Sequence, residues 1–264
     1  MVSPVPFDLP VIDDLSAIPT GDMPGDKVEI NETHVAKARA IAPRLWELLS
    51  PLLDDPPHRA VVAVHGGSGV GKSEIGSLLA HYLRANGVGA YVMSGDNYPR
   101  RVPRDNDAER LRTFRTGGLK SLVASGAYDG EVRGRLTGLQ ASDLDADPAR
   151  VADDPWLDTY QRAGRRALDT YLGAPQEIDF DEVSGLLQRF HDGAPSLLLK
   201  RMGREPDQLW YDEVDLSGVR VLVIEWTHGN SDHLRGVDIP VLLTSTPEET
   251  LAHRRSRNRD GRVD

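Results

Sequence analysis

Eight consecutive residues have the types and spacing to bind a chain of phosphates. They read G-G-S-G-V-G-K-S and fit the pattern G-x-x-x-x-G-K-[ST]. In such a loop the backbone N–H groups turn inward around an anion, the lysine reaches the β- and γ-phosphates, and the last hydroxyl lies on Mg²⁺. We therefore predict a nucleoside triphosphate site formed by Gly66, Gly67, Ser68, Gly69, Val70, Gly71, Lys72 and Ser73.

Two carboxylates follow apolar segments at positions where an α/β sheet binds ligands. Asp96 comes just after the segment 90–93, and Glu225 comes directly after the segment 219–224. Open parallel sheets bind ligands beyond the carboxyl ends of their strands, so both acids would face the phosphate loop. Phosphoryl transfer to an alcohol needs a carboxylate for the hydroxyl, a metal, and cations for the spreading charge. The plainer reading is that Asp96 forms a turn and Glu225 is a solvated acid.

Basic side chains gather in two kinds of place. A predicted helix opens at the capping box 246–249 and ends in four arginines, Arg254, Arg255, Arg257 and Arg259. These arginines would either close over the phosphates as a lid or simply suit the negative end of the helix dipole. Others follow Asp96 or lie on the predicted strand 196–199 and just after it: Arg100, Arg101, Lys200, Arg201 and Arg204. They suggest an anionic acceptor, although pairing with nearby acids explains any single one equally well.

The hydrophobic pattern predicts the elements that would position these residues. Apolar runs predict strands at 60–65, 90–93, 196–199, 219–224 and 239–243, and Pro240 suggests an edge or a bulge for the last of them. Helical spacing predicts a helix that is capped by Asn31 or Thr33 and ended by Pro51 with Pro56 and Pro57. It predicts further helices at 71–85, 107–125, 132–139, 156–172 and 180–190.

The order of these elements predicts an α/β fold of the P-loop NTPase type, with a parallel sheet sandwiched by helices. Residues 1–58 would form an N-terminal arm and a helix packed on the core, and residues 59–98 and 178–264 would form the P-loop kinase core. The segment 99–177 is polar and helical and lacks a comparable strand, so we expect a helical insertion that caps the acceptor.

Composition narrows the classes of function. The net charge of −10 argues against a general attraction to nucleic acid or anionic membranes, and the absence of cysteine excludes disulfides, thiolate metal sites and a cysteine nucleophile. The chain has no signal-peptide pattern at its start and no apolar run near the roughly 20 residues that span a bilayer. We expect a soluble, cytoplasmic protein with no nucleic-acid or membrane partner; a homodimer stays open.

The chain resembles the uridine kinase, phosphoribulokinase and pantothenate kinase group of P-loop kinases. Three blocks carry the resemblance: the phosphate loop with the S-G-D-N-Y segment 94–98, the I-D-F-D segment 178–181, and the strand that ends at Glu225 with the arginine helix 247–259. It departs from the group at Trp226, where a glycine is usual, at 174–177, where the ribose-binding aspartate is missing, and in the length of 99–177.

The resemblance implies an ATP- and Mg²⁺-dependent kinase that transfers the γ-phosphate to a hydroxyl of a small, anionic metabolite. It makes Asp96 the catalytic base, with Lys72 and Glu225 as further catalytic residues, and Ser73, Asp96 and Glu225 as metal ligands. Residues expected near the acceptor are Tyr98, Arg100, Arg101, Lys200, Arg201, Arg204, Tyr211 and His228. Alternatives are an adenylylsulfate kinase, an antibiotic phosphotransferase, or an ATPase switch without an acceptor.

Overall fold

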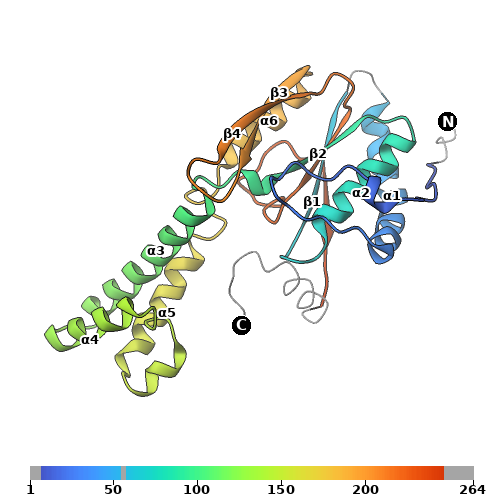
Figure 1. Ribbon diagram of the computed structural model, residues 1–264. Helices are drawn as coiled ribbons and strands as arrows, with labels where there is room; N and C mark the ends of the chain where they lie inside the picture. Colours follow the sequence, from blue (N-terminus) through green and yellow to red (C-terminus); the bar gives the residue numbers. More distant parts are fainter. Residues whose placement is uncertain (1–6, 55–57, 247–264) are drawn as a thin grey trace. The chain divides into compact units, whose positions relative to one another are not determined.

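The computed structural model describes residues 7–54 and 58–246 and divides the chain into two compact units (Figure 1). The core unit is built from the described parts of Met1–Tyr98, Asp179–Gly203 and Asp207–Asp264. The helical unit comprises Pro99–Ile178 and Arg204–Pro206. Each unit is described separately below.

A four-stranded parallel sheet forms the centre of the core unit. Its strands are β1 (Ala60–Gly66), β2 (Ala90–Ser94), β5 (Val221–Glu225) and β6 (Ile239–Leu243), in the order β2-β5-β1-β6. The register places Glu225 beside both Val64 and Ser94, so the carboxyl ends of three strands are level. The continuous burial of β1 and β5 explains their unbroken apolar sequences. Pro240 lies in an edge strand of this sheet, as predicted.

The helices α1 (Glu32–Leu53) and α2 (Lys72–Ala85) share one hydrophobic cluster with the sheet. Asn31 caps α1 in a reciprocal pair of hydrogen bonds with His34. The helix α1 continues past Pro51 and ends at Leu53, while Pro56 and Pro57, the other prolines of the predicted stop, lie outside the described residues. Proline removes one hydrogen bond from a helix. Only two helical residues follow Pro51, and the burial of Leu49 and Leu53 in the hydrophobic cluster offsets the lost bond.

The N-terminal arm lies along the core unit from Phe7 to Ile30. The Phe7 ring stacks on Trp46 of α1 at a centroid distance of 5.0 Å. Asp8 and Asn86 exchange two hydrogen bonds, from the Asp8 N–H to Oδ1 and from Nδ2 to the Asp8 carbonyl, both 2.8 Å. After the short helix η1 (Leu15–Ala17), Ile18 is buried in the main cluster. The arm is thus anchored at several points.

The helix α6 (Phe180–His191) and a two-stranded antiparallel sheet complete the core unit. That sheet pairs β3 (Ser196–Met202) with β4 (Leu209–Asp215). The strand β3 is longer than predicted because it continues through the buried Lys200 and Arg201. The strand β4 was not predicted: its sequence L-W-Y-D-E-V-D is exposed at nearly every position and has no regular apolar alternation.

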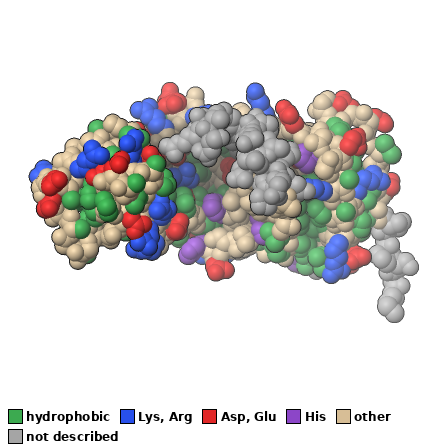
Figure 2. All heavy atoms as spheres, turned by 90° about the horizontal axis from the view of Figure 1, so that it is seen from below, with side chains coloured by type: hydrophobic (Ala, Val, Ile, Leu, Met, Phe, Trp, Pro, Cys, Tyr) green, Lys and Arg blue, Asp and Glu red, His purple; other side chains and the backbone are tan. Residues whose placement is uncertain are grey.

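The helical unit contains α3 (Pro103–Ala124), α4 (Gly130–Ala141), the short helix η3 (Pro148–Ala152) and α5 (Trp156–Asp169). Glycines let α3 and α5 approach closely, since a Cβ on Gly118 or Gly164 would overlap an aromatic ring of the other helix. Acidic and basic side chains alternate over the visible face of this unit (Figure 2). No helix among the described residues is long and apolar enough to cross a membrane.

Candidate active site

The phosphate loop joins β1 to α2 and has the backbone shape of an anion cradle. Gly66, Gly69 and Gly71 have φ values of 151°, 80° and 90°, which residues with a Cβ rarely adopt. A Cβ on Gly66 would also overlap the carbonyl oxygen of Leu243 in β6. Gly71 is the N-cap of α2 and has no capping side chain, so the positive end of the helix is directed at the loop. The loop fits a polyphosphate.

Lys72 and Ser73 begin α2 and carry the polar groups of the loop. The Lys72 ammonium donates to the Gly67 carbonyl at 3.0 Å, so its side chain folds back over the loop. The Ser73 hydroxyl donates to Glu225 Oε2 at 3.1 Å. Glu225 therefore lies at the hydroxyl that would bind the metal, on the strand beside β1.

Glu225 is 3% exposed and lies among polar groups at the end of β5. Ser94 donates to its second oxygen at 2.5 Å. Burial and the nearby negative charge of Asp96 raise the pKa of Glu225 above its ordinary value, against the opposing effects of Ser94, Lys72 and Ser73. Two carboxylates this close to each other favour a cation in their vicinity.

Asp96 is carried by a short turn, η2 (Gly95–Asn97), that follows β2. The turn packs against Trp226, and a Cβ on Gly95 would overlap the indole ring. The residue that departs from the kinase pattern therefore has a structural partner: the bulky Trp226 is accommodated because Gly95 has no side chain.

The donor set fits Mg²⁺ only together with phosphate oxygens. Among the described residues no group of three or more His, Asp or Glu side chains is arranged to hold a metal by itself. Mg²⁺ usually binds through one or two carboxylates, several waters and the phosphates of its nucleotide. The Ser73 hydroxyl with Glu225 matches that requirement.

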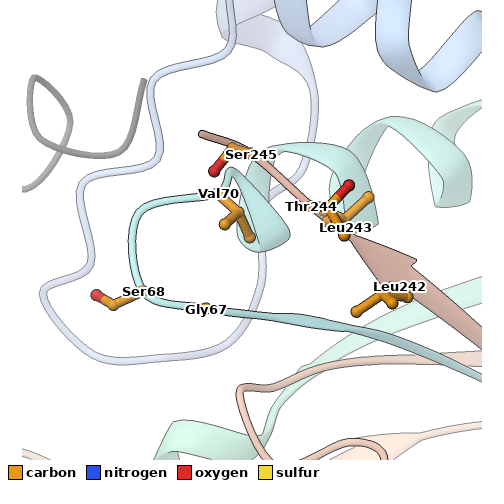
Figure 3. A pocket seen from close by; sticks show the side chains of 7 residues that line it. All are labelled: Gly67, Ser68, Val70, Leu242, Leu243, Thr244 and Ser245. Atoms are coloured by element: carbon orange, nitrogen blue, oxygen red, sulfur yellow. The ribbon is translucent and has the colours of Figure 1, made fainter. Parts of the chain in front are cut away.

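A cavity of about 430 Å³ lies beside the phosphate loop. Figure 3 shows Gly67, Ser68 and Val70 of the loop on one side and the end of β6 on the other. The second wall is formed by Leu242, Leu243, Thr244 and Ser245. The cavity is thus continuous with the place where phosphates would bind.

The chain is similar in sequence to a known protein. The chain is 36% identical over 220 residues, 83% of its length, to the bifunctional alpha-galactosidase/sucrose kinase AgaSK of Mediterraneibacter gnavus. It spans only 19% of that relative's length. No protein-family model matches the chain.

The parallel sheet, with the glycine-rich loop between β1 and α2, is the α/β arrangement that the sequence predicted. Two solved structures are also similar. One is a "putative fructose transport system kinase" from Silicibacter, with 20% identity, a TM-score of 0.49, and coverage of 86% of this chain and 84% of that one. The other is a "possible uridine kinase" from Bacillus stearothermophilus, with 16% identity, a TM-score of 0.47, and coverage of 86% of this chain and 97% of that one. The sequence similarity to a protein named as a sucrose kinase agrees with the predicted resemblance to kinases.

Three of the predicted acceptor residues lie together next to η2. The Lys200 ammonium is 5.8 Å from the centre of the Tyr98 ring and 3.6 Å from Glu182 Oε2. The Tyr211 hydroxyl donates to Glu182 at 2.7 Å, which raises the pKa of Tyr211 in addition to the larger effect of burial. Tyr98, Lys200 and Tyr211 thus share Glu182 as a neighbour, and the charge of Lys200 is matched by that carboxylate.

Arg201 and His228 have structural partners. Arg201 pairs with Asp22 at 2.9 Å and with Asp212 at 3.1 Å. His228 lies edge-on to the rings of Trp226 and Phe180, with centroid distances of 5.5 and 6.3 Å. The structure therefore places Arg201 in an ion-pair network and His228 in an aromatic cluster.

The remaining predicted cations belong to the helical unit or lie outside the described residues. Arg100 and Arg101 belong to the helical unit, where Arg100 donates to the Pro175 carbonyl and Arg101 to the Gln176 carbonyl. Arg204 also belongs to that unit. The predicted lid arginines Arg254, Arg255, Arg257 and Arg259 lie outside the described residues.

Sequence reasoning missed Asp22, Ser94 and Asn97. Ser94 and Asn97 flank Asp96, and their small polar side chains suggest nothing more than a turn. Asp22 is one acid in an arm rich in acids and prolines, so no local signal separates it from its neighbours. Only the folded chain brings it to the end of β2.

Proposed function

We propose that this protein is an ATP- and Mg²⁺-dependent kinase that phosphorylates a hydroxyl of a small sugar. The observation that carries the proposal is the meeting of Lys72, Ser73 and Glu225 at one end of the sheet, with Asp96 near enough to perturb Glu225. Transfer to an alcohol requires one carboxylate for the hydroxyl and another for the metal, and the ends of β2 and β5 supply Asp96 and Glu225. An ATPase switch has no acceptor alcohol to deprotonate.

Each residue has a distinct role in the proposed reaction. Backbone amides of the loop and Lys72 would hold the β- and γ-phosphates, and Ser73 and Glu225 would hold Mg²⁺, which when bound would supply positive charge to the phosphoryl oxygens. Asp96 accepts the proton of the acceptor hydroxyl. The hydroxyl oxygen forms a bond to the γ-phosphorus, the bond from that phosphorus to the bridging oxygen breaks, and ADP leaves. The nucleoside would extend into the cavity beside Leu242 and Ser245.

Two observations favour an uncharged sugar over an anionic acceptor. The similar protein AgaSK carries the name of a sucrose kinase. Lys200 and Arg201, which suggested an anion, are matched by the carboxylates of Glu182, Asp22 and Asp212. We propose that Tyr211 and Glu182 form part of the acceptor site, since carboxylates and aromatic rings suit sugar hydroxyls and C–H faces, while Tyr98 is fully buried and supports Lys200 from behind.

A screen of acceptors with labelled ATP and Mg²⁺ tests the proposal. We expect label to be transferred to sucrose or another neutral sugar, with little ATP consumption when no acceptor is present. Transfer to a sugar phosphate, to adenylylsulfate or to an antibiotic would contradict the neutral sugar and identify that compound as the acceptor instead. ATP hydrolysis that no acceptor increases would contradict the kinase and favour the switch.

A further inference from the structure

The side chain of Asp22 lies at the active-site end of β2, although it comes from the N-terminal arm. Its Oδ1 accepts hydrogen bonds from the Ser94 N–H at 2.7 Å and from Asn97 Nδ2 at 3.2 Å. Its Oδ2 accepts from the Tyr91 hydroxyl at 3.0 Å and from Arg201 at 2.9 Å. Four donors face this carboxylate, so both oxygens are fully used as acceptors.

Two of these donors flank the proposed base. Ser94 ends β2 and Asn97 ends η2, and Asp96 lies between them. Asn97 is fully buried, and its Oδ1 accepts from the Met202 N–H of β3 at 3.1 Å. The turn that carries Asp96 is therefore held on one side by Asp22 and on the other by β3.

The arm also touches the second carboxylate of the site. Gly21 lies so close to Glu225 that an added Cβ would be 3.7 Å from Glu225 Oε1. The segment 21–22 thus lies against the ends of β2 and β5, beside Val92, Ser94 and Glu225.

A role limited to neutralising Arg201 does not account for the geometry. Arg201 has a second carboxylate partner in Asp212. Only Oδ2 of Asp22 contacts Arg201, whereas Oδ1 is directed at the turn. Asp22 and Arg201 have side chains that are 9% and 8% exposed, so the pair forms a rigid, desolvated support. Burial raises the pKa of Asp22, against the opposing effects of the Ser94 N–H and of Arg201.

We propose that Asp22 is a positioning residue that fixes the Asp96 turn, which makes the N-terminal arm a part of the active site. This inference rests on the proposed function, because it takes Asp96 as the base. A carboxylate displaced by about 1 Å can lose roughly 100-fold in rate, so the support of the turn matters as much as its sequence.

The test compares Asp22→Asn with Asp14→Asn, which changes an exposed acid of the same arm. In Asp22→Asn one carboxylate oxygen is replaced by an NH₂ group, which is itself a donor. At least one of the four hydrogen bonds that Asp22 accepts is therefore lost. We expect kcat to fall roughly 10- to 100-fold while the KM for ATP stays within about threefold, since the phosphate loop is unchanged. Asp14→Asn should keep both values. A folded Asp22→Asn with wild-type kcat, or one that loses stability alone, would overturn the inference.

A second pair of variants decides the matter if Asp22→Asn does not fold. Asn97→Ala removes one of the two bonds that join Asp22 to the turn region, together with the bond to Met202, and leaves the Ser94 N–H bond in place. Tyr91→Phe removes a partner of Asp22 that is not in the turn. The inference requires a lower kcat in the first variant and a nearly unchanged kcat in the second, and equal effects would contradict it.

Hydrogen exchange separates this inference from the proposed function. The Ser94 N–H is bonded directly to Asp22, so Asp22→Asn should speed amide exchange in the segment 94–98 whether or not the protein transfers phosphate. If the wild type phosphorylates no acceptor and exchange still increases, the kinase proposal fails but the anchoring stands. Unchanged exchange would remove the anchoring itself.

Discussion

At the scale of single residues, the site depends on which polar groups surround Glu225. Its two oxygens accept from Ser73 and Ser94, and its burial beside Asp96 disfavours the negative charge that a metal would stabilise. Ser73 also belongs to the phosphate loop, so the proposed metal role would link Glu225 to the loop.

Replacing Glu225 by glutamine should weaken the use of Mg²⁺. The amide keeps the shape of the side chain but removes its charge, so the Mg²⁺ concentration that gives half-maximal activity should rise by about tenfold or more. A titration of activity with Mg²⁺ measures this. Glu213→Gln, a change at an exposed glutamate of β4, is the control. Equal Mg²⁺ requirements in both variants would contradict a metal role for Glu225.

Gly95 and Trp226 form a pair at the same scale. Gly95→Ala inserts a methyl group where the buried indole lies, so we expect the free energy of unfolding to fall by about 1–3 kcal/mol. Trp226→Leu in the same chain should restore part of it, because the smaller side chain leaves room. Gly185→Ala on the exposed face of α6, where a Cβ meets nothing within 4 Å, should not destabilise. Denaturant unfolding compares the variants, and an additive double mutant would count against the pairing.

At the scale of elements, local signals explain what the sequence could predict. The largely apolar strands β1, β2 and β5 and the glycine pattern after β1 are features of consecutive residues, so the phosphate loop and the places of Asp96 and Glu225 at strand ends followed from them. The exposed strand β4 lacks such a signal, and α1 passes through Pro51 because tertiary packing outweighs a local preference. The contacts of Asp22 join positions far apart in the chain, which no local pattern reveals.

The helical unit has its own pH-sensitive element at Glu177. Burial acts to raise the pKa of this carboxyl, but hydrogen bonds from the Gly173 N–H, Asn106 and Arg110 outweigh it and lower the pKa below its ordinary value of 4.5. A lowered folded-state pKa contributes stability above the unfolded value, and this is lost as the pH falls through the folded value.

We therefore expect acid to destabilise the wild type more than Glu177→Gln. Above pH 5 the variant should be less stable by about 1–3 kcal/mol, because a charged acceptor is lost, and the difference should shrink as the pH falls below about 4. Thermal unfolding between pH 7 and pH 3 measures it. A difference that is constant with pH would show that Glu177 does not titrate with folding.

At the scale of the whole molecule, the chain leaves the core unit and returns to it at neighbouring positions. The Asp179 N–H donates to the Tyr98 carbonyl at 2.9 Å, and Pro99 and Ile178 pair as a β-bridge. The helical unit can therefore be removed where its two ends meet. We keep the prediction that this unit selects the acceptor.

Replacing residues 99–178 by a short Gly-Ser linker tests that prediction. Binding of ATP should be retained, since the phosphate loop and its neighbours belong to the core unit, whereas transfer to the sugar should be lost. Nucleotide affinity and labelled transfer are measured on the same preparation. Sugar phosphorylation at the wild-type rate would show that the helical unit does not select the acceptor.

The transfer rate of Asp96→Asn in a single turnover tests the central claim most directly. With ATP bound and saturating sugar, we expect the rate of phosphate transfer to fall by about 10²–10⁴-fold, the usual contribution of a general base, with the affinity for ATP nearly unchanged. A variant that transfers phosphate at the wild-type rate would contradict the account.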